Sequence, residues 1–361
     1  MATSLYDGIV ELIKTSFYTE DVTDDVYFKD YTGHVSNSAL GLLNYMQGGS
    51  PQRYLDGFGD KKTKSLELGT VVHKMVLERD LYTISPVDKP SGKVGDIIDT
   101  IYSLTKEGLS QEDAIIEACK INDYYKGNPG EKRIAEIWNV GTEYLNFLRQ
   151  NNGNALVMTA ALKHKLKSCV ESINNNKKVN SLLFPKGQEC FRELPVFGTA
   201  LVKLSTVDEE LNIETFETIE IPIKAKIDFF SIDRLTNTVT LVDLKTTGKP
   251  IATFMGYFAN CFNGKYWEPN YVLGSFHTYH YYRQVAFYGD ILMAYLNNAG
   301  LIDESYKLDI KIAAVETNAP FGSEAIDIDE YSIKEGREEY SKLLRMLGRH
   351  MISGFDKTIM L

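Results

Sequence analysis

The sequence predicts a mixed α/β fold in which helices cover one β-sheet. Residues 221–233 and 238–247 both alternate with period two, and a short polar break between them favours an antiparallel hairpin. Residues 278–297 have a helical pattern and residues 306–316 alternate as a strand, so strand, helix and strand would form a right-handed crossover. Residues 108–183 are helical in pattern and indicate a helical lobe.

The other elements follow from the same periodicities. Residues 65–80 place apolar side chains at helical spacing, and residues 332–352 read as a closing amphipathic helix. A strand is predicted over 191–196. Along 221–233, strict alternation assigns one face of the strand to Ile223, Ala225, Ile227 and Phe229, and the other to Lys224, Lys226, Asp228 and Phe230.

Composition excludes several classes of protein. The chain has 361 residues, with 43% hydrophobic and 24% charged residues, which is typical of a globular protein and not of a disordered one. No apolar stretch is long enough to span a membrane, and Asp7 and Glu11 interrupt the N-terminal segment, so we expect a cytoplasmic protein. The four cysteines lack zinc or iron–sulfur spacing. A net charge of −10 disfavours coating of nucleic acid by bulk attraction, but it allows an enzyme with a local basic groove.

The predicted hairpin brings charged residues together. If residues 234–237 form the turn, Asp228 lies directly opposite Asp243, and Lys245 points to the same face of the sheet. Two opposed carboxylates about 5 Å apart repel each other unless a charge neutralises them, and a divalent cation would do so. Such a metal beside a lysine suits phosphodiester hydrolysis. The alternative is an exposed hairpin edge whose charges are solvated.

Four ordered motifs resemble the PD-(D/E)XK nuclease superfamily in its RecB/lambda-exonuclease branch. They are G-x-x-x-H at Gly69–His73, Ile227-Asp228, the DLKTT segment at Asp243–Thr247, and Q-x-x-x-Y at Gln284–Tyr288. The segments SNSAL (36–40) and ETNAPF (316–321) look most like the RecE (exodeoxyribonuclease VIII)-like phage exonucleases. The resemblance implies a restriction-endonuclease-like mixed sheet flanked by helices. We then expect one exonuclease domain over 1–361, with 81–183 a mostly helical insertion and 184–361 most of the catalytic sheet.

The resemblance also implies roles for particular residues. The implied metal ligands are His73, Asp228 and Asp243, with the Leu244 carbonyl as a fourth, for Mg²⁺ or Mn²⁺. Lys245 would be the catalytic lysine, and Gln284 and Tyr288 the accessory motif. A further acid of the preceding strand is either Glu193 or Glu189, and Glu193 is favoured because it begins the alternation ELPVF. His277 and His280 are interpreted as helix-start or substrate-side residues rather than a second metal pair.

The implied activity is a metal-dependent exonuclease acting 5′ to 3′ on the ends of linear double-stranded DNA. It would release 5′-mononucleotides and leave a 3′ single strand for recombination, in a phage or prophage context. Implied partners are a homo-oligomeric ring around the DNA and a single-strand annealing protein. Two alternatives stay open: a CRISPR-associated RecB-like single-strand exonuclease without an iron–sulfur cluster, and a catalytically inactive DNA-binding protein of the same fold.

Overall fold

The computed structural model describes residues 9–58, 64–124, 129–151, 155–208, 213–262 and 267–355. Their contacts divide the chain into two compact units. The first comprises residues 1–64 and 172–361 and contains the main sheet; the second comprises residues 65–171 and is mostly helical. No helix in the described ranges is long and apolar enough to cross a membrane.

The first unit is built on a mixed sheet with the strand order β1-β5-β6-β7-β10-β11, and β2 pairs with β5. The strands are β1 (Ile9–Leu12), β2 (Tyr18–Thr19), β5 (Glu189–Asp208), β6 (Ile213–Asp233), β7 (Thr238–Thr247), β10 (Lys307–Glu316) and β11 (Ser323–Asp327). All pairs are antiparallel except β7 with β10, which run parallel. The predicted mixed α/β sheet is confirmed.

The β6–β7 hairpin has the predicted turn. Asp233 pairs with Thr238, and the side chain of Asp233 accepts hydrogen bonds from the backbone N–H groups of Leu235 (2.8 Å) and Thr236 (3.3 Å). Asn237 adopts a left-handed backbone with φ of 48°, a conformation that asparagine tolerates better than most residues. Local side-chain chemistry therefore fixes the turn and, with it, the register of the two strands.

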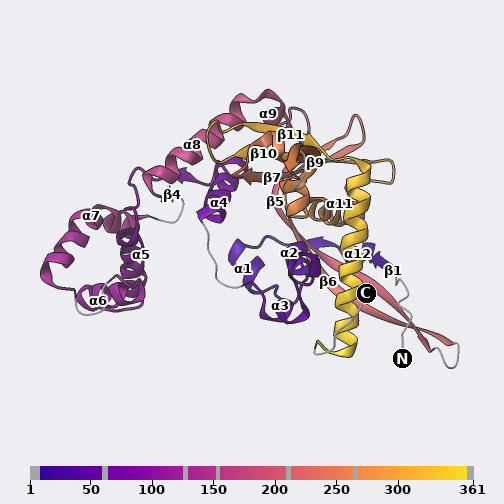
Figure 1. Cartoon of the computed structure of the whole chain (residues 1–361), viewed down its shortest axis with the longest axis horizontal. Coiled ribbons are helices and arrows are strands. Elements are labelled where there is room, and N and C mark those ends of the chain that lie inside the picture. The colour runs from indigo at the N-terminus through magenta and orange to yellow at the C-terminus, as the bar shows by residue number, and fades with distance from the viewer. Residues whose placement is uncertain are drawn as a thin grey trace. The chain divides into compact units, whose positions relative to one another are not determined.

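Helices pack on this sheet around one large core. The segment between β7 and β10 contains α10 (Ser275–Thr278) and α11 (Tyr281–Asn298), and α12 (Glu330–Ser353) closes the chain. Helices α11 and α12 pack against each other and against β5 and β6 (Figure 1). The core they share includes Phe230, Leu241 and Phe287. The helix predicted over 278–297 is split, because His280 takes a left-handed conformation (φ 53°) between α10 and α11.

Shorter elements complete the first unit. They are the helices α1 (Asp24–Lys29), α2 (Asn37–Gly41), α3 (Pro51–Asp56) and α9 (Lys177–Leu183), the 3-10 turns η1 (Lys14–Ser16), η2 (Tyr45–Gln47) and η3 (Ile251–Thr253), and a separate hairpin of β8 (Gly256–Phe262) and β9 (Trp267–Leu273). Thr23, Ser36 and Ser50 cap α1, α2 and α3 by accepting a backbone hydrogen bond.

The second unit has its own apolar core. It contains the helices α4 (Lys64–Leu77), α5 (Lys93–Lys106), α6 (Gln111–Ile121), α7 (Glu131–Gln150) and most of α8 (Ala160–Asn175), with a short parallel pair of β3 (Thr83–Ile84) and β4 (Ala155–Leu156). Ile98, Ile115 and Ile137 of α5, α6 and α7 are buried together. The helix predicted over 65–80 corresponds to α4, and the predicted helical character of 108–183 is confirmed.

Candidate active site

The end of β7 carries a buried acid and a lysine. The side chain of Asp243 is only 2% exposed, and its Oδ2 lies 2.6 Å from Nζ of Lys245. Its Oδ1 accepts a hydrogen bond of 3.0 Å from Nε2 of Gln284 on α11. Asp243 and Lys245 are two residues apart on one strand, so both side chains leave the same face. Helix α11 packs on this face of the sheet. Val239 and Leu241, which lie on the same face of β7, belong to the hydrophobic core that contains α11 residues.

Asp228 lies where the β6–β7 ladder stops. The last paired residues are Phe229 and Val242, so the predicted direct opposition of Asp228 and Asp243 does not occur as a ladder pair. Instead, Oδ2 of Asp228 accepts a hydrogen bond of 2.9 Å from the backbone N–H of Leu244. The carboxylate replaces a backbone partner and is thereby held between the two strands.

The alternation of β6 also changes at this point, which corrects the strict pattern expected from the sequence. Phe230 lies in the core with Ile227, and it stacks on Phe191 at a ring distance of 4.6 Å. Phe229 is buried elsewhere, beneath the guanidinium of Arg192 at 5.1 Å. Asp228 therefore occupies a local break in the pleat, which period-two reasoning could not foresee.

A matching break occurs at Glu193 in β5, the strand that pairs with β6 on its other side. Its backbone is left-handed, with φ of 50°, and the pairing of β5 with β6 skips this residue between Arg192 and Leu194. A non-glycine residue in this conformation inside a strand is strained, and such strain is concentrated at functional sites. One carboxylate oxygen of Glu193 lies within 4.8 Å of one of Asp228. Glu189 instead pairs with Arg234 at 2.7 Å, away from these residues.

Two lysines balance most of this negative charge. Lys226 lies 2.6 Å from Oε2 of Glu193 and 2.5 Å from Oδ1 of Asp24. Burial alone would lower the pKa of Lys226, but the charges of Glu193 and Asp24 outweigh it and raise that pKa. Burial likewise acts to lower the pKa of Lys245, and Asp243 and Asp228 reverse the effect. Both lysines are therefore ammonium ions at neutral pH.

Tyr281, Gln284 and Tyr288 present polar groups from α11 to this site. Nζ of Lys245 lies over the ring of Tyr281, 5.0 Å from its centroid. Burial raises the pKa of Tyr288 well above its ordinary value, and the charges of Asp243 and Asp228 act in the same direction. Tyr288 also shares a hydrogen bond with the Gln284 side chain. The two accessory residues thus share one face of α11, as their i, i+4 spacing predicts, and Gln284 contacts an acid rather than the lysine.

We call the five residues Glu193, Asp228, Asp243, Lys245 and Gln284 the catalytic cluster, after the role that we propose for them below. Its three carboxylates exceed by one the two ammonium groups of Lys245 and Lys226, and Asp24 adds a further negative charge. Clustered carboxylate oxygens are the ligands that Mg²⁺ and Mn²⁺ prefer. The oxygen donor set therefore fits a divalent cation. The Leu244 carbonyl remains a prediction, and so does His73, which lies on α4 in the second unit.

A second polar cluster lies beside the first on the same helix. Arg283, which is 3% exposed, donates from Nη1 to Oε1 of Glu339 at 2.7 Å and from Nε to Oδ1 of Asn37 at 2.9 Å. His280 and Asn44 also hydrogen-bond to the Glu339 carboxylate. We call these five residues the anchor cluster. It joins α2, α11 and α12. The close approach of α11 and α12 requires Gly336, since a Cβ there would lie 2.3 Å from the Tyr282 carbonyl oxygen.

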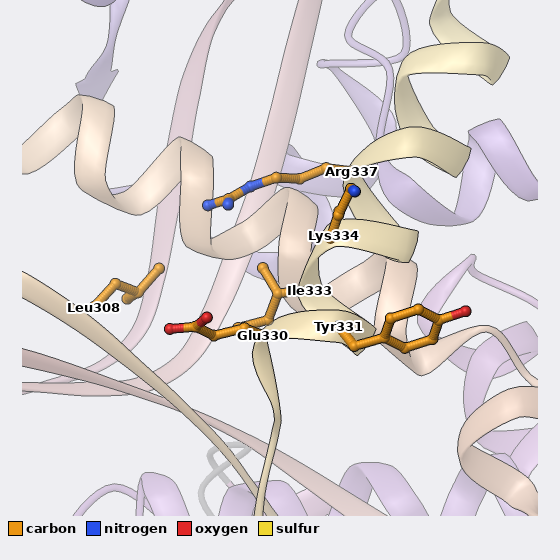
Figure 2. Close-up of a pocket in the computed structure, with 6 residues that line it drawn as sticks. All are labelled: Leu308, Glu330, Tyr331, Ile333, Lys334 and Arg337. Carbon is orange, nitrogen blue, oxygen red and sulfur yellow. The ribbon is translucent and has the colours of Figure 1, made fainter.

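An open pocket of about 300 Å³ adjoins the catalytic cluster. Its lining includes Gln284 and Tyr281 together with Tyr279, Arg53 and Asn37. A larger hollow of about 570 Å³ lies at the start of α12, and Figure 2 shows its lining residues, among them Leu308, Tyr331 and Arg337. None of the lining residues of this second hollow belongs to either cluster.

Comparison with known proteins identifies the family. A family model described as a PDDEXK-like domain of unknown function (DUF3799) matches residues 147–351, more than half of the chain. The chain belongs to this family. The match supports the PD-(D/E)XK resemblance at the level of the superfamily and does not distinguish the RecE-like branch.

Other comparisons add less to this assignment. A crystal structure from Eubacterium rectale, provisionally described as an exonuclease, aligns with the PDDEXK-like chain at a TM-score of 0.44 and 12% identity, covering 91% of this chain and 87% of that one. We draw no conclusion from so weak a likeness. No curated protein matches the chain in sequence.

Sequence reasoning gave no role to two residues near the site. The alternation of residues 221–233 placed Lys226 on the face of Asp228, but it did not mark Lys226 as a partner of the acids. Arg283 gave no such signal, because its partner Glu339 is far away in the sequence.

Proposed function

We propose that this PDDEXK-like protein is a metal-dependent nuclease that hydrolyses DNA from linear ends. The observation that carries the proposal is the buried Asp243, held between Lys245 and Gln284 next to Asp228, at the end of a strand in a PDDEXK-like fold. Burying the Asp243 carboxylate close to a second, half-buried one, Asp228, opposes folding, so a ligand that requires them explains their presence better than stability does.

Asp228, Asp243 and Glu193 would hold the metal, and His73 is proposed as a further ligand from its motif. A bound divalent cation would supply a polarised phosphoryl oxygen and an acidified water. Mg²⁺ is the proposed ion, and Mn²⁺ has the same preference for oxygen ligands.

The protein's own residues would orient the reaction. The Lys245 ammonium can contact a phosphoryl oxygen and stabilise the negative charge that grows during attack. Gln284 fixes the orientation of the Asp243 carboxylate through its hydrogen bond of 3.0 Å. Tyr288 keeps its proton, because burial raises its pKa, and can only donate or accept a hydrogen bond.

The finer activity is proposed from the motif resemblance. It comprises 5′ to 3′ degradation of double-stranded DNA, release of 5′-mononucleotides, and a 3′ single strand for an annealing protein in a phage or prophage. A homo-oligomeric ring would let local basic surfaces line a channel despite the net charge of −10. Elution of the purified protein as a monomer at micromolar concentration would contradict the ring.

The test is release of label from linear duplex DNA that is labelled at either the 5′ or the 3′ end. We expect Mg²⁺-dependent release of 5′ label as mononucleotides, no activity in EDTA, and no cleavage of closed circular DNA. Lys245→Ala should remove the activity. Lys334→Ala, an exposed lysine on α12, is the matched control and should cleave like the wild type.

Three outcomes separate the hypotheses. Release of 3′ label alone would reverse the polarity but keep the nuclease. Cleavage of circular DNA would indicate an endonuclease. A wild-type protein that retains DNA without cutting it, with every divalent metal tried, would establish the inactive DNA-binding alternative.

A further inference from the structure

We infer that the pocket beside the catalytic cluster is a nucleotide-binding subsite in which Tyr279 stacks on the base next to the scissile phosphate. The inference rests on the proposed function, and it adds a contact to the base that the catalytic cluster does not provide. It starts from the position of Tyr279, which is 56% exposed and lies two residues before the first residue of α11.

The pocket is continuous with the site of chemistry. Tyr281 and Gln284 line it, and these are the residues that contact Lys245 and Asp243. A DNA strand whose phosphate lies at Lys245 must therefore place a neighbouring nucleotide in or across this pocket. The pocket of about 300 Å³ is open to solvent, so a strand can enter it without displacing the core.

An aromatic row leads from the lysine into this space. The ring of Tyr281 lies 5.0 Å from Nζ of Lys245, and the ring of Tyr279 lies 5.7 Å from that of Tyr281. Phe254 stacks on Tyr281 from within the core at 5.9 Å, which fixes the orientation of that ring. The ring of Tyr281 is therefore already in contact with Lys245 and Phe254, whereas more than half of the Tyr279 surface remains available to a base.

The backbone around Tyr279 is fixed before any ligand binds. The N–H of Tyr279 donates to the Ser275 carbonyl at 3.0 Å, and the left-handed His280 that follows is hydrogen-bonded to Glu339. An exposed aromatic side chain on a rigid support loses little entropy when it stacks. Bases of every type can stack on it, which suits an enzyme that must degrade any sequence.

Charge in the pocket also matches a nucleotide. Arg53 is an exposed lining residue with a hydrogen bond of 3.0 Å to the Gly48 carbonyl, and within the described ranges it forms no ion pair. Its guanidinium can therefore meet a backbone phosphate. Asn37 and Arg283 also line the pocket but hydrogen-bond to each other, so they shape the wall.

The test is a cycle of protein variant against substrate. Cleavage is measured for the wild type, Tyr279→Ala and Tyr279→Phe on a duplex with a normal terminal nucleotide and on one with an abasic terminal nucleotide. Tyr279→Ala should lower kcat/KM about tenfold on the normal duplex, equivalent to about 1.4 kcal/mol of stacking, and should have no further effect on the abasic duplex. Tyr279→Phe should lose less than about twofold, because the ring is kept.

Tyr331→Ala is the matched control, since Tyr331 is another exposed tyrosine and lines the hollow at the start of α12. Equal loss by Tyr279→Ala on both duplexes, or no loss on either, would overturn the inference. Fluorescence of a terminal 2-aminopurine gives a readout that does not need cleavage. Quenching that requires Tyr279 in an inactive wild type would keep the subsite and refute the nuclease, and absence of quenching would refute the subsite.

Discussion

Arg283 and Gln284 are adjacent on α11, yet they serve two clusters of opposite character. The anchor cluster around Arg283 places one half-buried carboxylate, Glu339, among three protein donors, Arg283, His280 and Asn44. In the catalytic cluster around Gln284, carboxylate oxygens of Glu193 and Asp228 lie within 4.8 Å of each other at a break in both ladders of β6. Gln284 and Lys245 contact the third carboxylate, Asp243. In the first cluster protein donors surround one carboxylate, whereas the second brings several carboxylates to one site.

The difference indicates how each cluster should respond to a lost charge. Removing a carboxylate from the anchor cluster leaves donors without an acceptor and should destabilise the fold. Removing one from the catalytic cluster relieves repulsion between acids and should stabilise the protein without metal. Loss of a carboxylate from the catalytic cluster should therefore raise stability and lower activity. Loss of a carboxylate from the anchor cluster should not have these opposite effects.

The largest effect is expected from Asp228→Asn. The amide keeps an oxygen for the Leu244 N–H but loses the charge that a cation needs, so cleavage should fall about a thousandfold. Melting temperature without metal should stay equal or rise, and its increase on adding Mg²⁺ should disappear. Calorimetry with and without Mg²⁺, together with the cleavage assay, measures both changes.

Asp327→Asn, a change of an exposed acid on β11, is the control and should keep both the activity and the response to Mg²⁺. A metal-free Asp228→Asn protein that melts well below the wild type would show that Asp228 is a structural residue like Glu339.

Arg283→Met tests the anchor cluster and should cost about 3 kcal/mol of unfolding free energy, because Glu339 would lose a buried ion-pair partner. Urea denaturation monitored by circular dichroism measures it. Arg337→Met removes a more exposed ion pair, with Asp290, between the same two helices and should cost less than about 1 kcal/mol. Equal losses in the two variants would contradict the assigned difference in burial.

The two clusters also differ in how far the sequence could predict them. Asp228, Asp243, Lys245 and Gln284 come from short motifs on predicted elements. The paired residues of β6 and β7 have the register that the predicted turn at 234–237 requires, but the ladder stops before Asp228 and Asp243. The departure of Phe229 and Phe230 from strict alternation could not be predicted, because it accompanies the left-handed backbone of Glu193. The hydrophobic pattern of a sequence does not indicate the backbone dihedral angle of a single residue.

The anchor cluster had no signature of its own. Its members come from α2, η2, α11 and α12 or the residues that flank them, and only the packed fold brings Asn37, Arg283 and Glu339 together. The β8–β9 hairpin was also missed, since the sequence between β7 and α10 was not assigned to any element. Long-range pairings of this kind depend on topology rather than on local periodicity.

A smaller effect is expected from Gln284→Met, which keeps the size of the side chain but removes its hydrogen bond to Oδ1 of Asp243. Asp243 would keep Lys245 but lose the group that orients it, so kcat should fall about tenfold with little change in KM. Single-turnover cleavage separates the two parameters. Loss confined to KM would place Gln284 in substrate binding instead of positioning.

The smallest effect is the pH dependence of the anchor cluster. Burial acts to raise the pKa of Glu339, but hydrogen bonds from His280 and Tyr282 and the charge of Arg283 outweigh it and lower that pKa below 4.5. The unfolded carboxylate therefore takes up a proton at higher pH than the folded one. The stability that Glu339 contributes is present above pH 4.5 and is lost as pH falls through the folded-state pKa.

Urea denaturation of the wild type and Glu339→Gln from pH 6 to pH 3 should show the wild type more stable at pH 6 and the difference shrinking toward pH 3. Parallel curves would mean that the Glu339 carboxylate is no better stabilised in the folded protein than in the unfolded chain, and the contrast between the two clusters would fail.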